Sequence, residues 1–407
     1  MRILYLTVTL PFSAGGEDFF VPGIEALRRL GHEILIVPRS PKGALQGVEA
    51  SELLKMTRSE SLISWMVLSR AAGEWWRNAK TVTRMASKMG LQGSIMNRMK
   101  NLLVFPKGLW VAGIARDWRA DHIHAQWATT TATMALIASE VTGIPWSFTA
   151  HRGDIVQNNL LKLKVEQASF VRFISRSGVL LAKSLGISGV ETKARVIHMG
   201  VRLPRMAEDH QGDKCPAVAI CPANLIPVKG HTYLLQAVGL LKEKGLDITL
   251  KLAGKGPIRP RLEKEVRALG IEDRVTFLGQ IPHDEVLRML QTGGIGMMVL
   301  PSVDLGGGHH EGIPVSLMEA MSHGVPVIST STGGVPEILR DGAGLIVPPQ
   351  DAKALAEAME SVLIDNSLRQ SLQAKGRRRV EEEFSADRSM VQLSEAFEHS
   401  RGKGTGA

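Results

Sequence analysis

Cysteine is scarce in this sequence: the 407 residues contain two, Cys215 and Cys221. Two cysteines six positions apart form neither a disulfide framework nor the repeated close pairs of a zinc knuckle. We therefore expect reduced thiols in a cytoplasmic protein, with no metal held by cysteine.

Long hydrophobic runs are missing as well. The longest, such as ILIV and IGMMVL, have the length of a strand and fall far short of a membrane span. The opening MRILYLTVTLPFSAGG has an arginine, an apolar run and small residues, like a signal peptide. Its run is short and β-branched, however, which favours a buried first strand. With 44% hydrophobic and 22% charged residues, the chain has the composition of a soluble globular protein long enough for two domains.

Acidic residues are rare in one segment. Residues 51–120 hold twelve Lys and Arg against four acids, together with five of the seven tryptophans. Four basic residues recur there at helical spacing: Arg77, Lys80, Arg84 and Lys88. Three apolar residues lie on another face of the same predicted helix: Val82, Met85 and Met89. Such a surface suits the anionic inner face of a plasma membrane, and a solvated helix over an ordinary core is the alternative. Nucleic acid is not expected, because no recognition motif accompanies the charge.

Strand-like runs alternate with helical patterns along the whole chain, which predicts an α/β fold with two doubly wound, mostly parallel sheets. The expected strands are 2–8, 33–38, 122–127, 146–150, 170–175, 194–199, 217–223, 247–254, 274–279, 294–300, 325–330 and 343–348. The polar, aperiodic segment 201–216 is predicted to link a domain over 1–200 to a second over 217–383. A helix over about 384–399 is expected to pack back onto the first domain. Two such sheets suggest a ligand cleft between them.

Two glutamates surround the apolar run in EGIPVSLMEAMSHGVPVIS. Pro314 suits a helix start and Gly324 a helix stop, so Glu311 is expected in the loop and Glu319 inside the helix. Eight positions place them about 80° apart on a continuous helix, so they are expected to contact different parts of one elongated ligand. The free N–H groups at the helix start favour a phosphate between them. The alternative is a local cap at one glutamate and an exposed surface residue at the other.

Other strand ends carry similar turns. One has Lys229 and Gly230 before a helix, and another has Gly254 and Gly256. In the first half, such turns hold the residues Gly15, Gly16, His151, Arg152 and Asp154. Each turn alone is weak evidence, but together they predict a site for an anionic ligand.

The order of these motifs resembles that of the retaining family 4 glycosyltransferases, which have the GT-B architecture of two Rossmann-like domains. EGIPVSLMEAMSHGVPVIST with TGGVPEIL is similar to the family's E-x7-E signature and the segment after it. GGEDFFVPGIEALRRLGHEI resembles its first loop and helix, and HAQWATTTATMALIASEVTGIPWSFTAHRGDI its acceptor side. The likeness extends over most of the chain and is weakest between about 40 and 115.

The resemblance implies transfer of a sugar from a nucleotide diphosphate sugar to an acceptor hydroxyl, with retention of configuration. It places Glu311 at the hydroxyls of the donor sugar and Glu319 at the nucleotide ribose. Lys229 would neutralise the leaving diphosphate, and His151 would lie at the reacting face of the sugar. The other implied donor-side residues are Gly312, Ile313, Val315, Ser316, Asn224, Gly254, Gly256, Gly15 and Gly16. The acceptor-side candidates are Asp154, Arg152 and Trp127.

No cofactor and no metal are expected, because Lys229 and helix dipoles can stabilise the developing charge. The sequence also shows no pair of carboxylates suited to a double displacement. In the family's favoured mechanism the leaving phosphate deprotonates the acceptor, and Asp154 is kept as a candidate base.

One position departs from the family pattern. Where the family usually has arginine in G-R-L…K-G, this chain has Asn224 before Lys229. An asparagine lacks the bidentate phosphate contact of a guanidinium. Either Lys255, Arg259 or Arg261 compensates, or donor binding is weak. The adjacent His309 and His310 beside Glu311 suggest a metal site. Adjacent imidazoles on a Gly-rich loop more often shape a donor site or face solvent, so no metal is expected there.

Three function classes remain open. The first is a cytoplasmic transferase, peripheral at the membrane, that acts on a saccharide or a lipid-linked acceptor in cell-surface polysaccharide synthesis. The second is a non-catalytic or partner-dependent nucleotide-sugar binder, which the asparagine would suit. The third is a nucleotide-sugar 2-epimerase, which would need acid and base groups that the sequence does not show.

Overall fold

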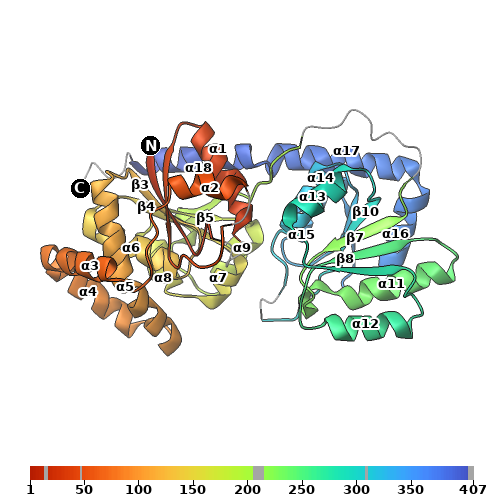
Figure 1. Ribbon diagram of the computed structural model, residues 1–407, viewed down its shortest axis with the longest axis horizontal. Coiled ribbons are helices and arrows are strands. Elements are labelled where there is room, and N and C mark those ends of the chain that lie inside the picture. The colour runs from red at the N-terminus through yellow and green to blue at the C-terminus, as the bar shows by residue number, and fades with distance from the viewer. Residues whose placement is uncertain (13–16, 46–47, 205–214, 308–309, 402–407) are drawn as a thin grey trace. The chain divides into compact units, whose positions relative to one another are not determined.

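The structure is a computed structural model that describes residues 1–12, 17–45, 48–204, 215–307 and 310–401. The chain divides into two compact units (Figure 1). Unit 1 comprises Met1–His198 and Asp387–Ala407, and unit 2 comprises Met199–Ala386. The chain therefore enters unit 2 once, completes it, and returns to unit 1. Each unit is built on a six-stranded sheet.

The sheet of unit 1 is parallel throughout, in the order β2-β1-β3-β4-β5-β6. Its strands are β1 (Arg2–Thr7), β2 (Glu33–Pro38), β3 (His122–Ala125), β4 (Trp146–Ala150), β5 (Phe170–Phe173) and β6 (Ala194–Val196). Most of these strands are buried on both faces, which is why their sequences are continuous apolar runs. The carboxyl ends of β1, β3 and β4 meet at one edge of the sheet.

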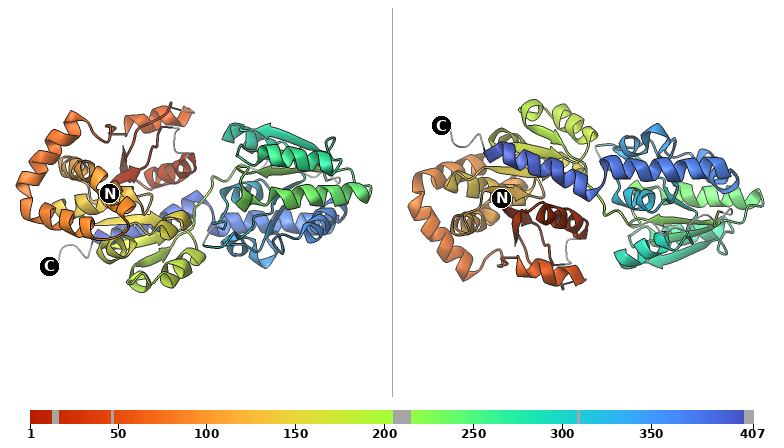
Figure 2. Two further views of the ribbon diagram at one scale, coloured as in Figure 1. Left: turned by 90° about the horizontal axis from the view of Figure 1, so that it is seen from below. Right: turned by 90° about the horizontal axis from the view of Figure 1, so that it is seen from above.

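Helices cover this sheet, and four of them form an insertion between β2 and β3. The insertion consists of α2 (Val48–Lys55), α3 (Trp65–Arg77), α4 (Ala79–Leu91) and α5 (Ile95–Asp117). Of these, α3, α4 and α5 appear in orange at one side of unit 1 in Figure 2. The others are η2 (Asp18–Phe20), α1 (Val21–Arg29), α6 (Thr130–Thr142), α7 (Arg152–Gln157), α8 (Leu161–Gln167), α9 (Arg176–Ser184) and α10 (Val190–Lys193). A Cβ at Gly108 would lie 2.8 Å from the Ile137 side chain, so α5 and α6 pack at close range.

Helix α18 (Ala386–Arg401) completes unit 1 (Figure 2). Its Phe397 ring lies 4.8 Å from the ring of His122, and its Ser400 hydroxyl lies 3.0 Å from Nδ1 of that histidine. His122 and His124 also bind the Ser147 hydroxyl at 2.7 and 2.8 Å. The two histidines are therefore satisfied core residues.

Unit 2 has the parallel order β12-β11-β10-β7-β8-β9. Its strands are β7 (Val218–Pro222), β8 (Thr249–Ala253), β9 (Val275–Gly279), β10 (Met297–Leu300), β11 (Val327–Thr330) and β12 (Leu345–Val347). Its helices are η3 (Pro227–Lys229), α11 (His231–Glu243), α12 (Arg259–Ala268), α13 (His283–Gln291), α14 (Val315–Ser322), α15 (Val335–Leu339), η4 (Arg340–Gly342), α16 (Ala352–Ile364) and α17 (Asn366–Glu383).

All twelve predicted strands are present, one to three residues shorter at some ends, and the predicted α/β class is confirmed. Most of the predicted linker, residues 205–214, lies outside the described residues. Val201, at its start, instead pairs with Ser385 in a parallel bridge. Among the described residues, no helix is both long and apolar enough to cross a bilayer.

Candidate functional site

A buried carboxylate organises the loop that follows β1. The side chain of Glu17 accepts hydrogen bonds from the backbone N–H groups of Val8, Thr9 and Leu10 at 3.0, 2.6 and 2.9 Å. It also accepts from the Thr9 hydroxyl at 3.1 Å and from the Trp127 indole at 2.5 Å. Sequence analysis missed Glu17 and named the preceding Gly15 and Gly16, which lie outside the described residues. An acid directly after a double glycine at a strand end was the available signal.

His151 follows β4 and lies against Trp127. Their ring centroids are 4.3 Å apart, and the Phe20 ring lies 5.7 Å from the imidazole. Burial lowers the pKa of His151 to about 3, helped by the charge of Arg172 and opposed by a hydrogen bond to the Gln126 backbone. The imidazole is therefore neutral at physiological pH. Its Nε2 is buried and has no hydrogen-bond partner among the residues that the structure describes.

Asp154 and Lys164 hold the loop after β3 from two sides. Oδ2 of Asp154 accepts from the N–H groups of Ala128 and His151 at 2.9 and 3.3 Å. Nζ of Lys164 donates to the carbonyls of Ala128 and Thr129 at 2.9 and 2.7 Å. Burial raises the pKa of Asp154 to about 7, and the nearby charge of Lys164 works against this rise. Burial lowers the pKa of Lys164 to about 7, and the charge of Asp154 works against this fall. The contacts of Asp154 are those of a positioning group, and its role as a base stays a prediction.

Arg172 on β5 is a second charged group that sequence analysis missed. It is 1% exposed, and its guanidinium donates to the carbonyls of Ile197 and His198 at 2.9 and 2.6 Å. Burial lowers its pKa to about 10. The structure thus brings Trp127, His151 and Asp154 together at one edge of the sheet, over a layer of buried charge. Arg152, the first residue of α7, is half-buried beside them.

In unit 2 the turn after β7 places Lys229 against Glu311. Nζ of Lys229 lies 2.6 Å from Oε2 of Glu311, and the Ser302 hydroxyl donates to the same oxygen at 3.0 Å. Gly230 has a φ of 65°, and a Cβ there would lie 1.9 Å from the Pro301 carbonyl oxygen. The glycine thus lets the turn approach the end of β10, which brings the lysine to the glutamate. Both side chains keep some exposure, 18% and 14%.

Glu319 has a different partner from Glu311. Its Oε1 lies 2.7 Å from Nε2 of His283, a residue of α13 that sequence analysis missed. Helix α14 runs from Val315 to Ser322, so one glutamate precedes the helix and the other lies inside it, as predicted. The helix has no side-chain N-cap, so N–H groups of its first turn are not bound by a capping side chain.

Comparison with known proteins decides the family of this unit. Residues 205–379 match the family described as Glycosyl transferases group 1. Unit 2 is a glycosyl transferases group 1 domain. The resemblance read from the E-x7-E segment is thereby confirmed at the level of this domain.

Two relatives extend the comparison. A putative colanic acid biosynthesis glycosyltransferase, WcaL of Salmonella typhimurium, is 34% identical over 207 residues, 50% of each chain. An alpha-D-kanosaminyltransferase of Streptomyces kanamyceticus is 34% identical over 145 residues, 35% of this chain and 36% of its own. The chain spans about half the length of the first of these curated relatives.

Solved structures share the fold over nearly the whole chain. HepE of Anabaena in complex with UDP has a TM-score of 0.71 at 17% identity and covers 98% of this chain and 100% of its own. Sucrose-phosphate synthase from Thermosynechococcus elongatus has a TM-score of 0.72 at 20% identity, with 99% and 100% covered. This likeness confirms the predicted GT-B fold.

The glycines of the group 1 domain fall into two kinds. A Cβ at Gly254 or Gly256 would lie 2.0 or 2.1 Å from the carbonyl oxygen of Ala223 or Leu225. These two glycines therefore allow the loop after β8 to pack against the loop after β7. A Cβ at Gly312 would meet nothing within 4 Å. Gly312 lies beside Ile313 at the start of α14, where Val315 and Ser316 form the first turn.

Asn224 of the group 1 domain is exposed at the end of β7. Of the three cations considered in its place, Arg259 lies 5.4 Å from the Phe277 ring centroid and 2.8 Å from Glu263. Lys255 and Arg261 are exposed. His310 lies with Nδ1 2.8 Å from the backbone oxygen of Glu311, while His309 is outside the described residues. No group of three or more His, Cys, Asp or Glu in the described part of the chain is arranged to hold a metal ion.

Proposed function

We propose that the protein transfers a sugar from a nucleotide diphosphate sugar to a saccharide acceptor hydroxyl during polysaccharide assembly. The observation that carries this proposal is the Lys229–Glu311 pair beside the uncapped start of α14, in a glycosyl transferases group 1 domain. A cation, a hydrogen-bond acceptor and free N–H groups are the elements that a sugar diphosphate needs. The colanic acid relative supports the polysaccharide assignment.

Donor binding would replace one ion pair by two ligand contacts. Without a ligand, Lys229 and Glu311 neutralise each other at 2.6 Å. A bound donor would offer its diphosphate to the lysine and a sugar hydroxyl to the glutamate. The N–H groups near Gly312 and Ile313 would face the sugar, and those near Val315 and Ser316 the phosphates. Glu319 would accept from the ribose, with His283 holding its carboxylate in place.

The acceptor would bind unit 1, where Nε2 of His151 has no hydrogen-bond partner within the described part of the chain. Trp127 and Arg152 would form the surface around it. We propose a retaining transfer in which the leaving phosphate takes the acceptor proton, with Lys229 and the α14 N–H groups stabilising the diphosphate without a metal ion. We further propose a lipid-linked acceptor and a cytoplasmic enzyme that contacts an anionic membrane through residues 51–120.

The test is binding of UDP, GDP, ADP and TDP to the purified protein by thermal shift and calorimetry, with and without EDTA. A ligand that binds the native state alone raises its melting temperature. We expect one diphosphate to bind with EDTA present. Lys229→Met should weaken that binding by about tenfold to a hundredfold, because a hydrogen bond to a charged group contributes about 1.5–3 kcal/mol.

Lys242→Met is the matched control, since Lys242 is also paired with an acid, Asp273 at 2.8 Å, on another surface of unit 2. It should bind as the wild type does. Glu311→Gln should keep diphosphate binding and lose the additional affinity and turnover that the sugar provides. Unchanged binding in Lys229→Met, or no binding of any diphosphate by folded protein, would reject the proposal. Donor binding without transfer would identify a nucleotide-sugar binder instead.

A further inference from the structure

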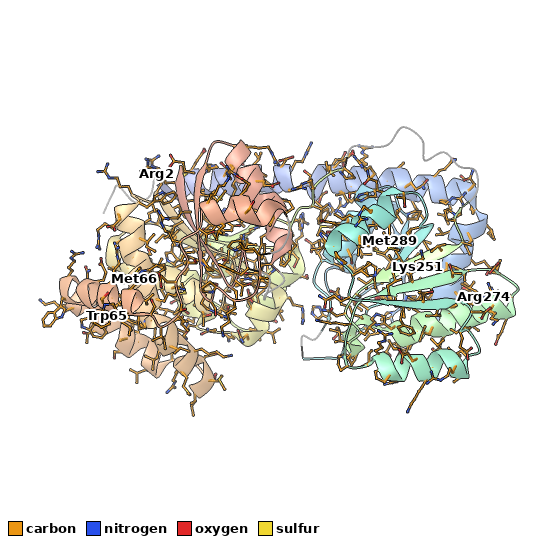
Figure 3. All side chains as sticks on the ribbon, viewed as in Figure 1. Arg2, Trp65, Met66, Lys251, Arg274 and Met289 are labelled. Atoms are coloured by element: carbon orange, nitrogen blue, oxygen red, sulfur yellow. The ribbon has the colours of Figure 1, made fainter. Side chains whose placement is uncertain are left out.

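On helix α3 two tryptophans are exposed to solvent and a glutamate is buried. Trp65 and Trp76 are each 84% exposed, whereas Glu74 is 1% exposed and lies 2.7 Å from Arg116. Eleven positions separate the two tryptophans, which places them about 20° apart around the helix, on one stripe. The charged residues of α3 lie about 120° to 180° away from Trp65 by the same geometry. Figure 3 shows Trp65 and Met66 at the outside of unit 1.

The first half of α5 has the same reversed polarity. Asn101 is fully buried, where it donates to Oδ1 of Asn159 at 2.7 Å and accepts from the Thr133 hydroxyl at 2.8 Å. Five apolar side chains on the other side are between 49% and 75% exposed: Ile95, Met96, Met99, Leu102 and Leu103. A surface helix of a globular protein normally has the opposite arrangement.

Apolar exposure is concentrated in this part of the chain. Twelve of the 23 exposed large hydrophobic side chains among the described residues fall between 63 and 103. Their side chains cannot all be scattered single residues of the ordinary kind, because the segment is about a tenth of the chain. Such a concentration of exposed apolar side chains is typical of an interaction surface.

The charge beside the apolar faces is positive. Residues 65–117 contain nine Lys and Arg and two acids. Both acids are already paired, Glu74 with Arg116 and Asp117 with Arg70. Lys80, Lys88 and Lys100 have no carboxylate partner in the part of the chain that the structure describes.

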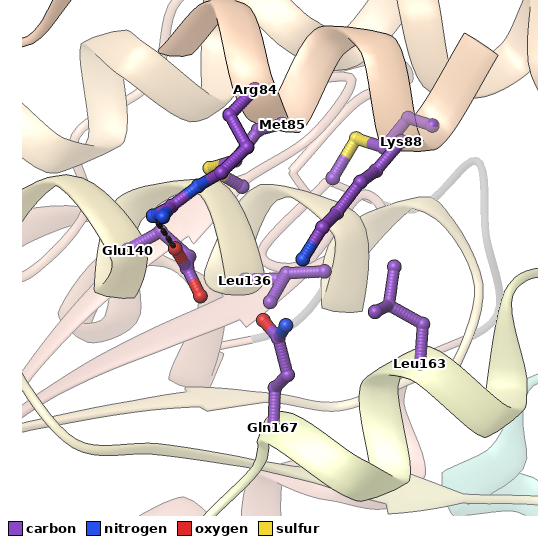
Figure 4. A pocket seen from close by; sticks show the side chains of 8 residues that line it. Arg84, Met85, Lys88, Leu136, Glu140, Leu163 and Gln167 are labelled. Carbon is purple, nitrogen blue, oxygen red and sulfur yellow. Dashed lines mark ion pairs between the residues drawn. The ribbon is translucent and has the colours of Figure 1, made fainter. Parts of the chain in front are cut away.

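Lys80 and Lys88 belong to α4, whose opposite face is anchored in the core. Met85 and Met89 are buried, and Arg84 lies 3.6 Å from Glu140 of α6. Lys88 extends over a shallow pocket that Leu136 of α6 helps to line (Figure 4). Of the predicted basic stripe, Lys80, Arg84 and Lys88 lie on α4, whereas Arg77 ends α3. The predicted apolar residues Val82, Met85 and Met89 form the buried face of α4.

We propose that α3, α4 and the first half of α5 form a docking surface for an anionic lipid bilayer, into whose interface Trp65 and Trp76 insert. Tryptophan and aliphatic side chains favour the boundary between headgroups and acyl chains, and lysines bind anionic headgroups. A second copy of the chain is the weaker fit, because it would bring two strongly basic surfaces together. The inference sharpens the membrane part of the proposed function and does not depend on sugar transfer, so either can fail alone.

The test is co-sedimentation of the full chain with vesicles of phosphatidylcholine, with and without phosphatidylglycerol. We expect binding to the anionic vesicles and a blue shift of tryptophan emission. Trp65→Ser with Trp76→Ser should lower the vesicle partition coefficient by at least tenfold at low and at high salt. Lys80→Gln with Lys88→Gln should lower it by about fivefold per lysine at low salt, which corresponds to about 1 kcal/mol each, with little effect at high salt.

Leu180→Ser with Ile364→Ser is the matched control, since these side chains are 67% and 68% exposed and lie outside the docking surface. The control should bind vesicles as the wild type does. Equal binding by the tryptophan variant, or no binding by the wild type, would overturn the proposal. A wild-type dimer that the tryptophan variant makes monomeric, without vesicle binding, would overturn it in favour of a protein interface.

Discussion

The charged side chains at the strand ends of the two units differ in burial and in hydrogen-bond partners. In unit 1, Glu17, Asp154 and Lys164 are buried, and their hydrogen bonds go mostly to backbone groups of neighbouring loops. In unit 2, Lys229 and Glu311 are partly exposed and bind mainly to each other. Buried charges bound to backbone fix the shape of a loop. A partly exposed pair of side chains can separate and bind a ligand.

Glu17 and Glu311 differ in the number of hydrogen bonds that would be lost if the carboxylate moved to a ligand. Five donors converge on Glu17, so moving its carboxylate would leave several buried groups without a partner. Glu311 has two donors, Lys229 and Ser302, and water can reach the site. Unit 1 therefore resembles a preformed surface, and unit 2 a site that rearranges locally when it binds.

The largest expected effect is on stability. Glu17→Ala should lower the free energy of unfolding by about 3–5 kcal/mol, because it leaves buried donors unpaired. Glu311→Ala should cost about 1 kcal/mol or less, because Lys229 can be rehydrated. Urea unfolding of both variants checks the comparison. Similar losses in the two variants would remove the distinction between the units.

The second effect is a pH dependence that belongs to unit 1. The pKa of Asp154 is about 7 in the native state and near 3.9 in an unfolded chain, so the native state binds more protons between about pH 4 and pH 7. The contribution of Asp154 to stability therefore falls as pH rises through that interval, by up to about 1.4 kcal/mol per pH unit. Lys164, whose pKa is lowered, works in the opposite direction above pH 7.

Asp154→Asn keeps an acceptor for the backbone N–H groups and removes the titration. Relative to the wild type it should become more stable as the pH rises from about 4 to 7, as measured by urea unfolding at several pH values. Asp273→Asn is the control in unit 2, where the hydrogen bond from Lys242 lowers the pKa of an exposed carboxyl. Because the native pKa of Asp273 lies below its ordinary value, that control should change with the opposite sign below about pH 5 and stay nearly flat from there to pH 7. A flat difference for Asp154→Asn would contradict the burial argument.

The smallest effect concerns the open site of unit 2. Asn224 is exposed, so Asn224→Arg should add a phosphate contact without disturbing the fold. We expect a gain in diphosphate affinity of at most about fivefold, because an exposed charge contributes about 0.2–1 kcal/mol. Calorimetry with Asn224→Gln as the neutral control measures it. A loss of affinity would show that residue 224 does not face the diphosphate.

Local patterns were enough to predict much of the fold. Twelve strands, the limits of α14 and the two faces of α4 all follow from short-range periodicity and from proline and glycine signals. Lys229 and Glu311 could be assigned to one site because both follow strands of one parallel sheet. Their direct contact depends on the close approach of Gly230 to Pro301, which no local pattern reveals.

Groups that act across long distances in the sequence escaped prediction. His283 was missed because it meets Glu319 from another helix, and the Trp127 indole reaches Glu17 from 110 positions away. The other donors to Glu17 are local, so that residue could have been found from the acid that follows the double glycine. The segment 51–120 was recognised by its charge, but periodicity could not tell which tryptophans are outside. Trp110 is 4% exposed and Trp65 is 84% exposed, and tertiary packing alone separates them.

The return of α18 to unit 1 has a consequence for biosynthesis. Ser394 and Phe397 fill positions next to His32 and His122, so the core of unit 1 stays open at that place until α18 has left the ribosome. Domains usually fold in the order in which they are translated. Here the group 1 domain can fold before unit 1 is complete, because α18 of unit 1 is translated after all of unit 2. Until then, apolar surface of unit 1 stays exposed. The first unit to emerge is the last to be finished.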